Sequence, residues 1–418
     1  MNIKVYFQQI FKNRSFCLFL LSDFFLFLIS QFYFLAQVSM ILEITKSTIL
    51  LGTVLMIMAI PRLIILPIGG ILTDKFSEKK VLIFGYTSLI CFLATFGLLI
   101  TFNFLSITVI FFFAALFGVS SALILPATYS IVPKLVDEEA LQSANALVQF
   151  LNQLSFFIGP AIAGLLLGIL ELGTFFFLMI TLIILSLILI LYIKPQTDLN
   201  IIIEDDNRAS SKGFRHIIRN PTVVMLLLFT AMLNISVIGP QQVGLPVLAD
   251  DYFKMDTKGL GYLLSTFGLG SLLGVVVVGL ISNKKNNLII LSLLAIQFGI
   301  IWTVFTWINN FWIVFSLLFL TGFLIGVINV LFITALQTLS PKYLLGRVMS
   351  LQFMGSTGLQ PISYFFTGLL IILTSLKITF VIAGSIITVF SIIVIACVNY
   401  LKVKKNNKKV FDVIKERG

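Results

Sequence analysis

The sequence predicts an all-α polytopic membrane protein with twelve transmembrane helices in two six-helix pseudo-repeats. Of its 418 residues, 59% are hydrophobic and only 11% are charged, with a mean hydropathy of +1.10. A soluble domain of this length does not need so much apolar surface for its core. Apolar stretches of about 20 residues, the length that crosses a bilayer as a helix, recur along both halves of the chain.

The first six stretches form a predicted N-terminal bundle, residues 15–193, after a cytoplasmic N-terminus at 1–14. They cover 15–42, 47–73, 81–101, 105–133, 140–170 and 174–193. A hydrophilic cytoplasmic linker is expected at 194–220. The C-terminal bundle, residues 221–401, holds 221–248, 259–282, 288–308, 311–336, 346–374 and 378–401. A cytoplasmic basic tail follows at 402–418.

The basic residues predict the orientation of these helices. Lysines and arginines gather in the N-terminal segment, the linker, the tail and alternate loops. The opposite side has only Lys46, Lys254, Lys258 and Lys377. Because cytoplasmic loops are enriched in Lys and Arg, we expect a multi-pass protein of the cytoplasmic membrane with both termini in the cytoplasm. Topology therefore accounts for the net charge of +11, and no nucleic-acid partner is expected.

The two halves repeat at a nearly constant spacing. Gly70 in the second stretch corresponds to Gly279 in the eighth, and Asp74 corresponds to Asn283. Parallel repeats of this kind place a transport site near the middle of the bilayer. Because Asn283 lacks the charge of Asp74, any device that depends on this aspartate is expected in the first half alone.

A short charged turn joins the second and third stretches, and the glycines before it, Gly69 and Gly70, are expected to let another helix approach closely. It resembles the signature loop of the major facilitator superfamily at Gly70, Asp74, Lys75, Lys79 and Lys80. Ser77 replaces a usual glycine, and Glu78 a usual basic residue. The resemblance implies that the aspartate locks one face shut through the start of the eleventh helix, where Arg347 lies. An ordinary cytoplasmic turn is the alternative.

Further segments, covering essentially the whole chain, resemble the branch of macrolide-efflux proteins and enterobactin exporters, also called transmembrane secretion effectors. In the fifth stretch the residues that are similar to an exporter signature are Gly159, Pro160 and Gly164. A kinked, tightly packed helix is the alternative reading of these residues. The resemblance implies the major facilitator fold and a transporter rather than an enzyme.

No cofactor or metal is expected. The sequence has no glycine-rich lysine loop for nucleotide phosphates. Its three cysteines, Cys17, Cys91 and Cys397, fall in apolar stretches, and His216 has no companions at metal-binding spacing.

Two charges lie deep in apolar stretches, Asp23 in the first and Arg62 in the second. A lone charge near the bilayer centre costs at least about 2.5 to 3.5 kcal/mol, so each needs water or a partner. We expect that they pair in at least one state, and that protonation of Asp23 loosens the pair and couples protons to helix movement. A fixed pair that only neutralises two charges is the alternative.

Polar side chains at middle depth are candidates for substrate contact. They are Gln31, Asn145, Gln149, Asn152, Asn234, Asn329 and Gln360. In the resembled fold their helices line the cavity, although buried amides also bond neighbouring helices.

We therefore expect a monomeric secondary transporter that exports a small organic molecule by proton antiport, with substrate, protons and lipid as its partners. A siderophore is favoured over an amphipathic drug. Proton-coupled uptake of a nutrient uses the same fold and stays an alternative. A membrane-embedded enzyme or scaffold is the alternative from another class, but no cluster of His, Asp or Glu supplies an enzyme site.

Overall fold

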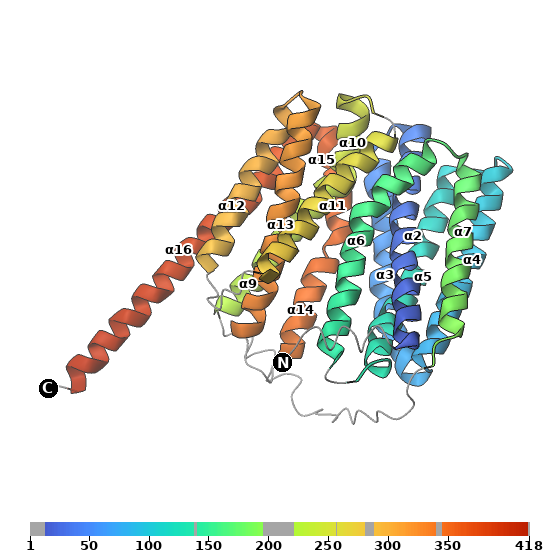
Figure 1. Cartoon of the computed structure of the whole chain (residues 1–418). Helices are drawn as coiled ribbons and strands as arrows, with labels where there is room; N and C mark the ends of the chain where they lie inside the picture. The colour runs from blue at the N-terminus through green and yellow to red at the C-terminus, as the bar shows by residue number, and fades with distance from the viewer. Residues whose placement is uncertain are drawn as a thin grey trace.

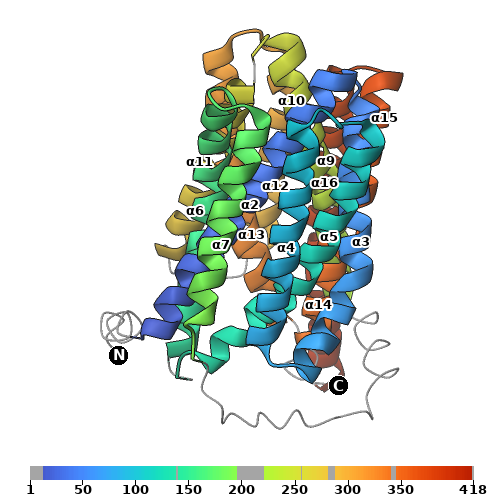
Figure 2. The same ribbon diagram turned by 90° about the vertical axis from the view of Figure 1, so that its right-hand side faces the viewer.

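The computed structural model describes residues 13–137, 140–194, 221–255, 257–280, 288–339 and 345–416; within these ranges the side chains at positions 74, 142, 221, 222, 279, 280, 339, 345–347, 349, 350 and 353 and those beyond Asn399 are not described. Over the described ranges the chain is helical without strands, and twelve helices are long and apolar enough to cross a membrane. They stand side by side in two groups (Figures 1 and 2). The predicted fold class is confirmed.

Three of the six helices in the N-terminal group start with polar side-chain caps. Its members are α2 (Arg14–Thr45), α3 (Thr48–Lys75), α4 (Glu78–Thr101), α5 (Ile107–Ile131), α6 (Leu141–Leu167) and α7 (Leu172–Leu191). The side-chain oxygens of Asn13, Ser47 and Ser106 accept backbone N–H bonds from the first turns of α2, α3 and α5. Such caps satisfy N–H groups that have no partner inside the helix. The predicted spans lie within a few residues of these helices.

The C-terminal group is less regular. Its longer helices are α9 (Pro221–Gly239), α11 (Thr257–Leu280), α12 (Leu288–Val304), α13 (Phe311–Leu339), α14 (Leu345–Thr357), α15 (Gln360–Leu373) and α16 (Leu376–Glu416). The seventh span continues beyond α9 through two π-helical turns, Pro240–Gly244 and Leu248–Tyr252, on either side of α10 (Leu245–Val247). Proline has no N–H for the α-helical ladder, and such wide turns are frequent at functional sites.

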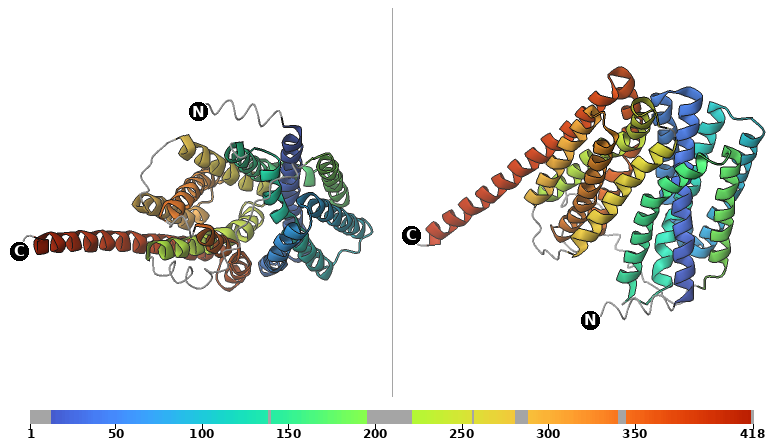
Figure 3. Two further views of the ribbon diagram at one scale, coloured as in Figure 1. Left: turned by 90° about the horizontal axis from the view of Figure 1, so that it is seen from below. Right: turned by 45° about the horizontal axis from the view of Figure 1, so that its top comes forward.

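Two elements differ from the sequence expectation. The eleventh span, expected as one helix over 346–374, is broken between α14 and α15. Pro361 cannot donate a backbone hydrogen bond, and Gly358 is a weak helix former; the new helix starts where Ser363 N donates to Leu359 O at 2.9 Å. The twelfth span was expected over 378–401 with a basic tail after it; the helix that contains this span, α16, continues through the tail to Glu416 and projects beyond the bundle (Figure 3).

The two groups of helices converge at one end and separate at the other (Figure 1). At the end that carries Lys46, Thr48 Oγ1 donates to Gly368 O at 3.3 Å, and the hydroxyls of Ser39 and Thr257 lie 2.8 Å apart. We call this the closed end. The end that carries the turn before α4 is the open end.

Two glycines on one face of α3 show this difference directly. A Cβ on Gly52 would collide with the carbonyl oxygen of Tyr364 on α15, so the two backbones touch there. Gly70 lies five turns further along α3, at about 3.6 residues per turn, and so on the same face. Nothing lies within 4 Å of a Cβ placed on Gly70. The halves are therefore in contact at the closed end and apart at the open end.

Candidate functional site

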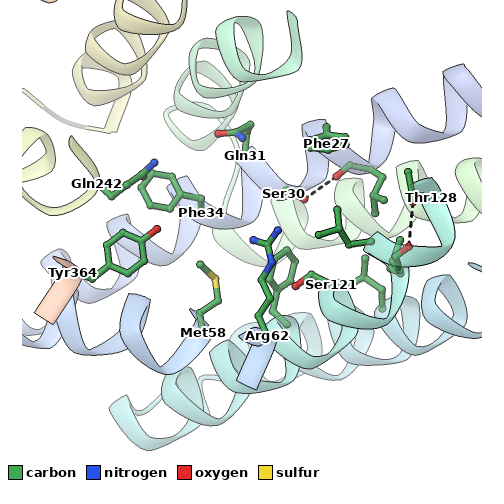
Figure 4. A pocket seen from close by; sticks show the side chains of 15 residues that line it. Phe27, Ser30, Gln31, Phe34, Met58, Arg62, Ser121, Thr128, Gln242 and Tyr364 are labelled. Carbon is green, nitrogen blue, oxygen red and sulfur yellow. Dashed lines mark hydrogen bonds between the residues drawn. The ribbon is translucent and has the colours of Figure 1, made fainter. Parts of the chain in front are cut away.

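Two cavities lie where the halves face each other. The first, about 230 Å³, is lined mainly by α2, α3 and α5, with Gln242 and Tyr364 from the C-terminal half (Figure 4). The second, about 280 Å³, is lined mainly by α9, α11, α13 and α14, with Gln153 and Phe156 from α6. We call them the amino-half and carboxy-half cavities. Each takes side chains from both halves, as a transport site between two repeats requires.

The amino-half cavity brings together two residues that the sequence singled out, Arg62 and Gln31. The guanidinium group of Arg62 points into the cavity, with Gln31 and Tyr364 around it (Figure 4). Its Nε atom is buried and has no hydrogen-bond partner. Among the described side chains, no carboxylate lies within ion-pair distance of this charged donor.

Asp23 lies elsewhere in the N-terminal half and lines neither cavity. Its side chain is 1% exposed, and both carboxylate oxygens lack a hydrogen-bond partner. The adjacent Ser22 Oγ bonds to the Tyr86 hydroxyl at 3.3 Å and to Ser186 O at 3.0 Å. The carboxylate is therefore sealed inside the helix bundle, next to a polar network.

The expected ion pair between Asp23 and Arg62 is not made in this conformation. Among the described side chains, the ion pair that forms joins Lys134 Nζ to Glu78 Oε1 at 2.7 Å. Tyr129 of α5 lies within electrostatic range of both Asp23 and Arg62, and its hydroxyl interacts with Gln149. Tyr129 was not predicted, because nothing in its sequence spacing relates it to either charge.

The carboxy-half cavity contains two of the predicted amides, Asn234 and Asn329. Asn234 Nδ2 donates to the backbone oxygen of Thr230 at 2.9 Å, so its carbonyl oxygen is left for a ligand or water. Three further amides line this cavity and were not predicted: Gln153, Gln241 and Gln352. Gln153 follows Gln149 by one helical turn, a spacing that could have revealed it.

The other predicted amides lie outside both cavities. Asn145 and Gln149 are exposed on α6, and Asn152 buries an Oδ1 atom that has no partner. Gln360 begins α15, directly after the break in the eleventh span. These four line neither cavity in this conformation.

Helix α6 packs closely against helices of both halves through its glycines. A Cβ on Gly159 would lie 2.7 Å from Gln31 Cβ on α2, and one on Gly164 would lie 2.9 Å from Thr257 O on α11. On the facing helix, a Cβ on Gly261 would lie 2.5 Å from Pro160 O. Gly159 thereby lets Gln31 occupy the wall of the amino-half cavity.

The turn between α3 and α4 lies at the open end, and the side chains of Asp74 and Arg347 are outside the described part of the structure. Lys75 and Lys80 are exposed, whereas Lys79 Nζ donates to the backbone oxygens of Leu191 and Ile193, both at 2.7 Å. Glu78, an unusual residue for this loop, pairs with Lys134. The turn is therefore tied to its own half.

In this conformation, the expectation that both glycines before the turn admit a helix holds for Gly69 only. A Cβ there would lie 2.6 Å from Ala122 O on α5, whereas Gly70 faces open space.

Comparison with known proteins agrees with this architecture. The chain is 28% identical over 324 residues to the "Enterobactin exporter EntS" of Shigella boydii, covering 73% of each chain. It is 29% identical over 303 residues to the protein of the same name from Escherichia coli, covering 68% of each.

Among solved structures, the nucleoside transporter NupG superposes with a TM-score of 0.71 at 12% identity, over 91% of this chain and 98% of that one. A POT family transporter in complex with 5-aminolevulinic acid gives 0.69 at 14%, over 92% and 96%. At these identities the likeness concerns the fold alone. The sequence profile of the Major Facilitator Superfamily matches residues 15–363 and 242–411. The chain is thus a membrane transporter rather than an enzyme, and it belongs to the Major Facilitator Superfamily.

Proposed function

We propose that this transporter exports a siderophore-like small organic molecule across the cytoplasmic membrane by proton antiport. The observation that carries the proposal is the pair of cavities between halves that are closed at one end and apart at the other. An exporter takes up its cargo from the cytoplasm, so the conformation in which it loads is open on that side. The name printed for the curated relatives, enterobactin exporter, supports export and a siderophore as cargo.

The orientation follows from charge. Lys75, Lys80 and Lys134 lie at the open end, whereas Lys46 and Lys377 lie at the closed end, where Lys377 sits over the ring of Trp307. The sequences of the linker and the tail, which follow Lys194 and Asn399, are also rich in lysine and arginine. The excess of positive charge favours a cytoplasmic open end, with both termini on that side.

Asp23 is the proposed proton carrier. Its buried carboxylate has no partner in this conformation, and an unpaired charge at that depth is costly. Taking up a proton removes the charge, and pairing with Arg62 in another conformation would stabilise it. A group whose proton is bound in one state and released in the other couples proton flow to the exchange of states.

The test uses inside-out vesicles that contain the full chain, with a proton gradient imposed and a labelled catecholate siderophore outside. We expect siderophore accumulation that stops when a protonophore collapses the gradient, together with measurable proton release from the vesicles. Accumulation only when the gradient is reversed would instead support the alternative, nutrient uptake by symport. No flux of siderophores or amphipathic drugs under either gradient would contradict the proposal.

A further inference from the structure

We propose that the amino-half cavity binds an organic anion carried on an aromatic group, with Arg62 as its counter-charge. This inference rests on the proposed transport function and narrows its substrate class.

Arg62 is the one charged residue among the fifteen that line this cavity. Its Nε atom is buried without a hydrogen-bond partner, and none of the described carboxylates lies within ion-pair distance of it. An unpaired charge at this depth costs at least about 2.5 to 3.5 kcal/mol, a penalty that a bound anion would offset. Arginine also presents a planar fork of donors that matches a carboxylate or phenolate.

The other polar groups of the cavity divide into two kinds. The hydroxyls of Ser30, Ser121 and Thr128 donate to backbone oxygens of their own helices, at 3.0, 2.9 and 3.2 Å. Their hydrogens are therefore occupied, and they do not compete with Arg62 for an anion. Gln31 and Gln242 face the same space as the guanidinium group (Figure 4). Because Gln242 Oε1 is buried and unpartnered, it can accept a hydrogen bond from a ligand hydroxyl.

Flat aromatic side chains form much of the remaining wall: Phe27, Phe34, Phe117 and Tyr364. The ring of Phe117 is held in place by stacking on Tyr33, with centroids 4.0 Å apart and an interplanar angle of 8°. Rigid rings favour a planar ligand group. The volume, about 230 Å³, is below the range of about 300 to 1,000 Å³ that holds a whole drug-sized ligand. The cavity suits one aromatic acid unit of the cargo.

The position of this cavity relates binding to the movement of the halves. Arg62 lies on α3, whereas Tyr364 lies on α15, at the point where α3 and α15 touch. An anion held against both residues would contact both halves. Such a ligand has different contacts in the two end states, which is the condition for it to shift their populations.

The experiment measures the affinity of the purified full-length protein, by equilibrium dialysis, for two probes of the same shape. They are 2-naphthoate and its neutral amide, 2-naphthamide. At neutral pH the acid is ionised, so the pair differs mainly in charge. We expect the wild type to bind 2-naphthoate about tenfold or more tightly than 2-naphthamide. Arg62→Gln should abolish this preference and leave the affinity for 2-naphthamide within about twofold of the wild-type value. Arg62→Lys should retain part of the preference for the anion.

The control, Lys377→Gln, removes a positive charge at the closed end, where Lys377 lies over the rings of Tyr252 and Trp307. It should bind both probes as the wild type does. Equal binding of the two probes by the wild type would overturn the inference, and so would tighter binding of 2-naphthylmethylammonium, the cation of similar shape. These comparisons need no variant, so a misfolded Arg62→Gln protein would not weaken the test.

The assay also separates the inference from the proposed function. Anion-selective binding without proton-driven flux would keep this site and refute antiport. Proton-driven export by a protein with no preference for 2-naphthoate would support antiport and refute this anion site.

Discussion

Asp23 and Arg62 mark the limit of what a single sequence reveals about a pair of residues. Each was identified because a charge inside an apolar stretch is costly, which needs no knowledge of the fold. Whether they meet depends on the rotation of two helices to within a few ångströms, and in this conformation they are not paired. Arg62 lines a cavity and Asp23 does not. The sequence therefore predicted two candidate residues and could not predict that they occupy separate environments.

The first prediction concerns Asp23→Asn, which keeps the size of the side chain and removes its ability to exchange a proton. We expect proton-coupled flux in vesicles to fall about tenfold or more, while exchange of substrate down its own gradient continues. Binding of 2-naphthoate should change by less than about twofold, because Asp23 does not line the cavity. Asp250→Asn, at an exposed position near the closed end, is the matched control and should transport normally. Full coupling in Asp23→Asn would exclude this carboxylate as the proton site.

Gln153 supplies a second prediction at this scale. Its Nε2 atom donates to Ser271 Oγ at 3.0 Å and so links the two halves. One such bond contributes about 0.5 to 1.5 kcal/mol. Gln153→Leu should therefore change the equilibrium constant between the two end states by up to about tenfold against the one with the closed end shut, as seen by spin-label distances across that end. An unchanged distance distribution would mean that the glycine packing and the hydrogen bonds of Thr48 and Ser39 at the closed end hold the halves together without this bond.

At the scale of helices, the contact between α6 and α11 depends on small residues. Gly164 and Gly261 face each other, and any larger side chain on Gly261 meets the backbone at Pro160. The glycines of α6 were visible in the sequence, but nothing in it connected them to Gly261 on α11. Its partner could not be predicted, because the register between two helices is a property of the folded molecule.

Gly261→Val tests this contact. Overpacking of a tight helix contact typically costs about 1 to 3 kcal/mol, so we expect a lower melting temperature and weaker contact between the halves at the closed end. Gly355→Ala is the control, since nothing lies within 4 Å of a Cβ at that position, and alanine is the better helix former. Equal melting temperatures for the two variants would show that α6 and α11 separate at little cost.

The break between α14 and α15 could not be predicted from hydropathy. Both of its causes, Gly358 and Pro361, were present in the sequence, yet the segment around them, although the least apolar of the twelve spans, is still apolar enough to be counted as one span. Hydropathy reports whether a segment enters the membrane and says little about its backbone geometry. The same holds for the π-helical turns of the seventh span.

For the whole molecule, the sequence predicted the number of spans, their order and the division into halves. It could not predict which end is closed, since one sequence has to be compatible with both end states of a transporter. The glycines of α3 make this concrete. Gly52 and Gly70 are two glycines on the same face of one predicted helix. Only the structure shows that Gly52 is packed against the other half and Gly70 is not.

The contacts at the closed end also predict how the open end closes. Thr48 bonds to Gly368, and Gly52 meets Tyr364, so four residues forward along α3 correspond to four residues back along α15. Extending this antiparallel register to Gly70 brings it opposite Gly346, at the start of α14. Two glycines facing each other would allow the same close backbone contact that Gly52 allows at the closed end. We therefore expect α3 and α14 to touch at these two positions when the open end shuts.

Disulfide trapping can test that register. With Cys17, Cys91 and Cys397 replaced by serine, the pair Gly70→Cys and Gly346→Cys should cross-link under mild oxidation, because the two Cα atoms come within the 4.4 to 6.8 Å of a disulfide when the open end shuts. The cross-link should stop transport until a reductant is added. The pair Gly70→Cys and Gly355→Cys is the control: it lies between the same two helices but nine residues out of register, about 13 Å at 1.5 Å per residue, and should not cross-link. Cross-linking of the control alone would mean that the break before α15 shifts the register as the open end closes.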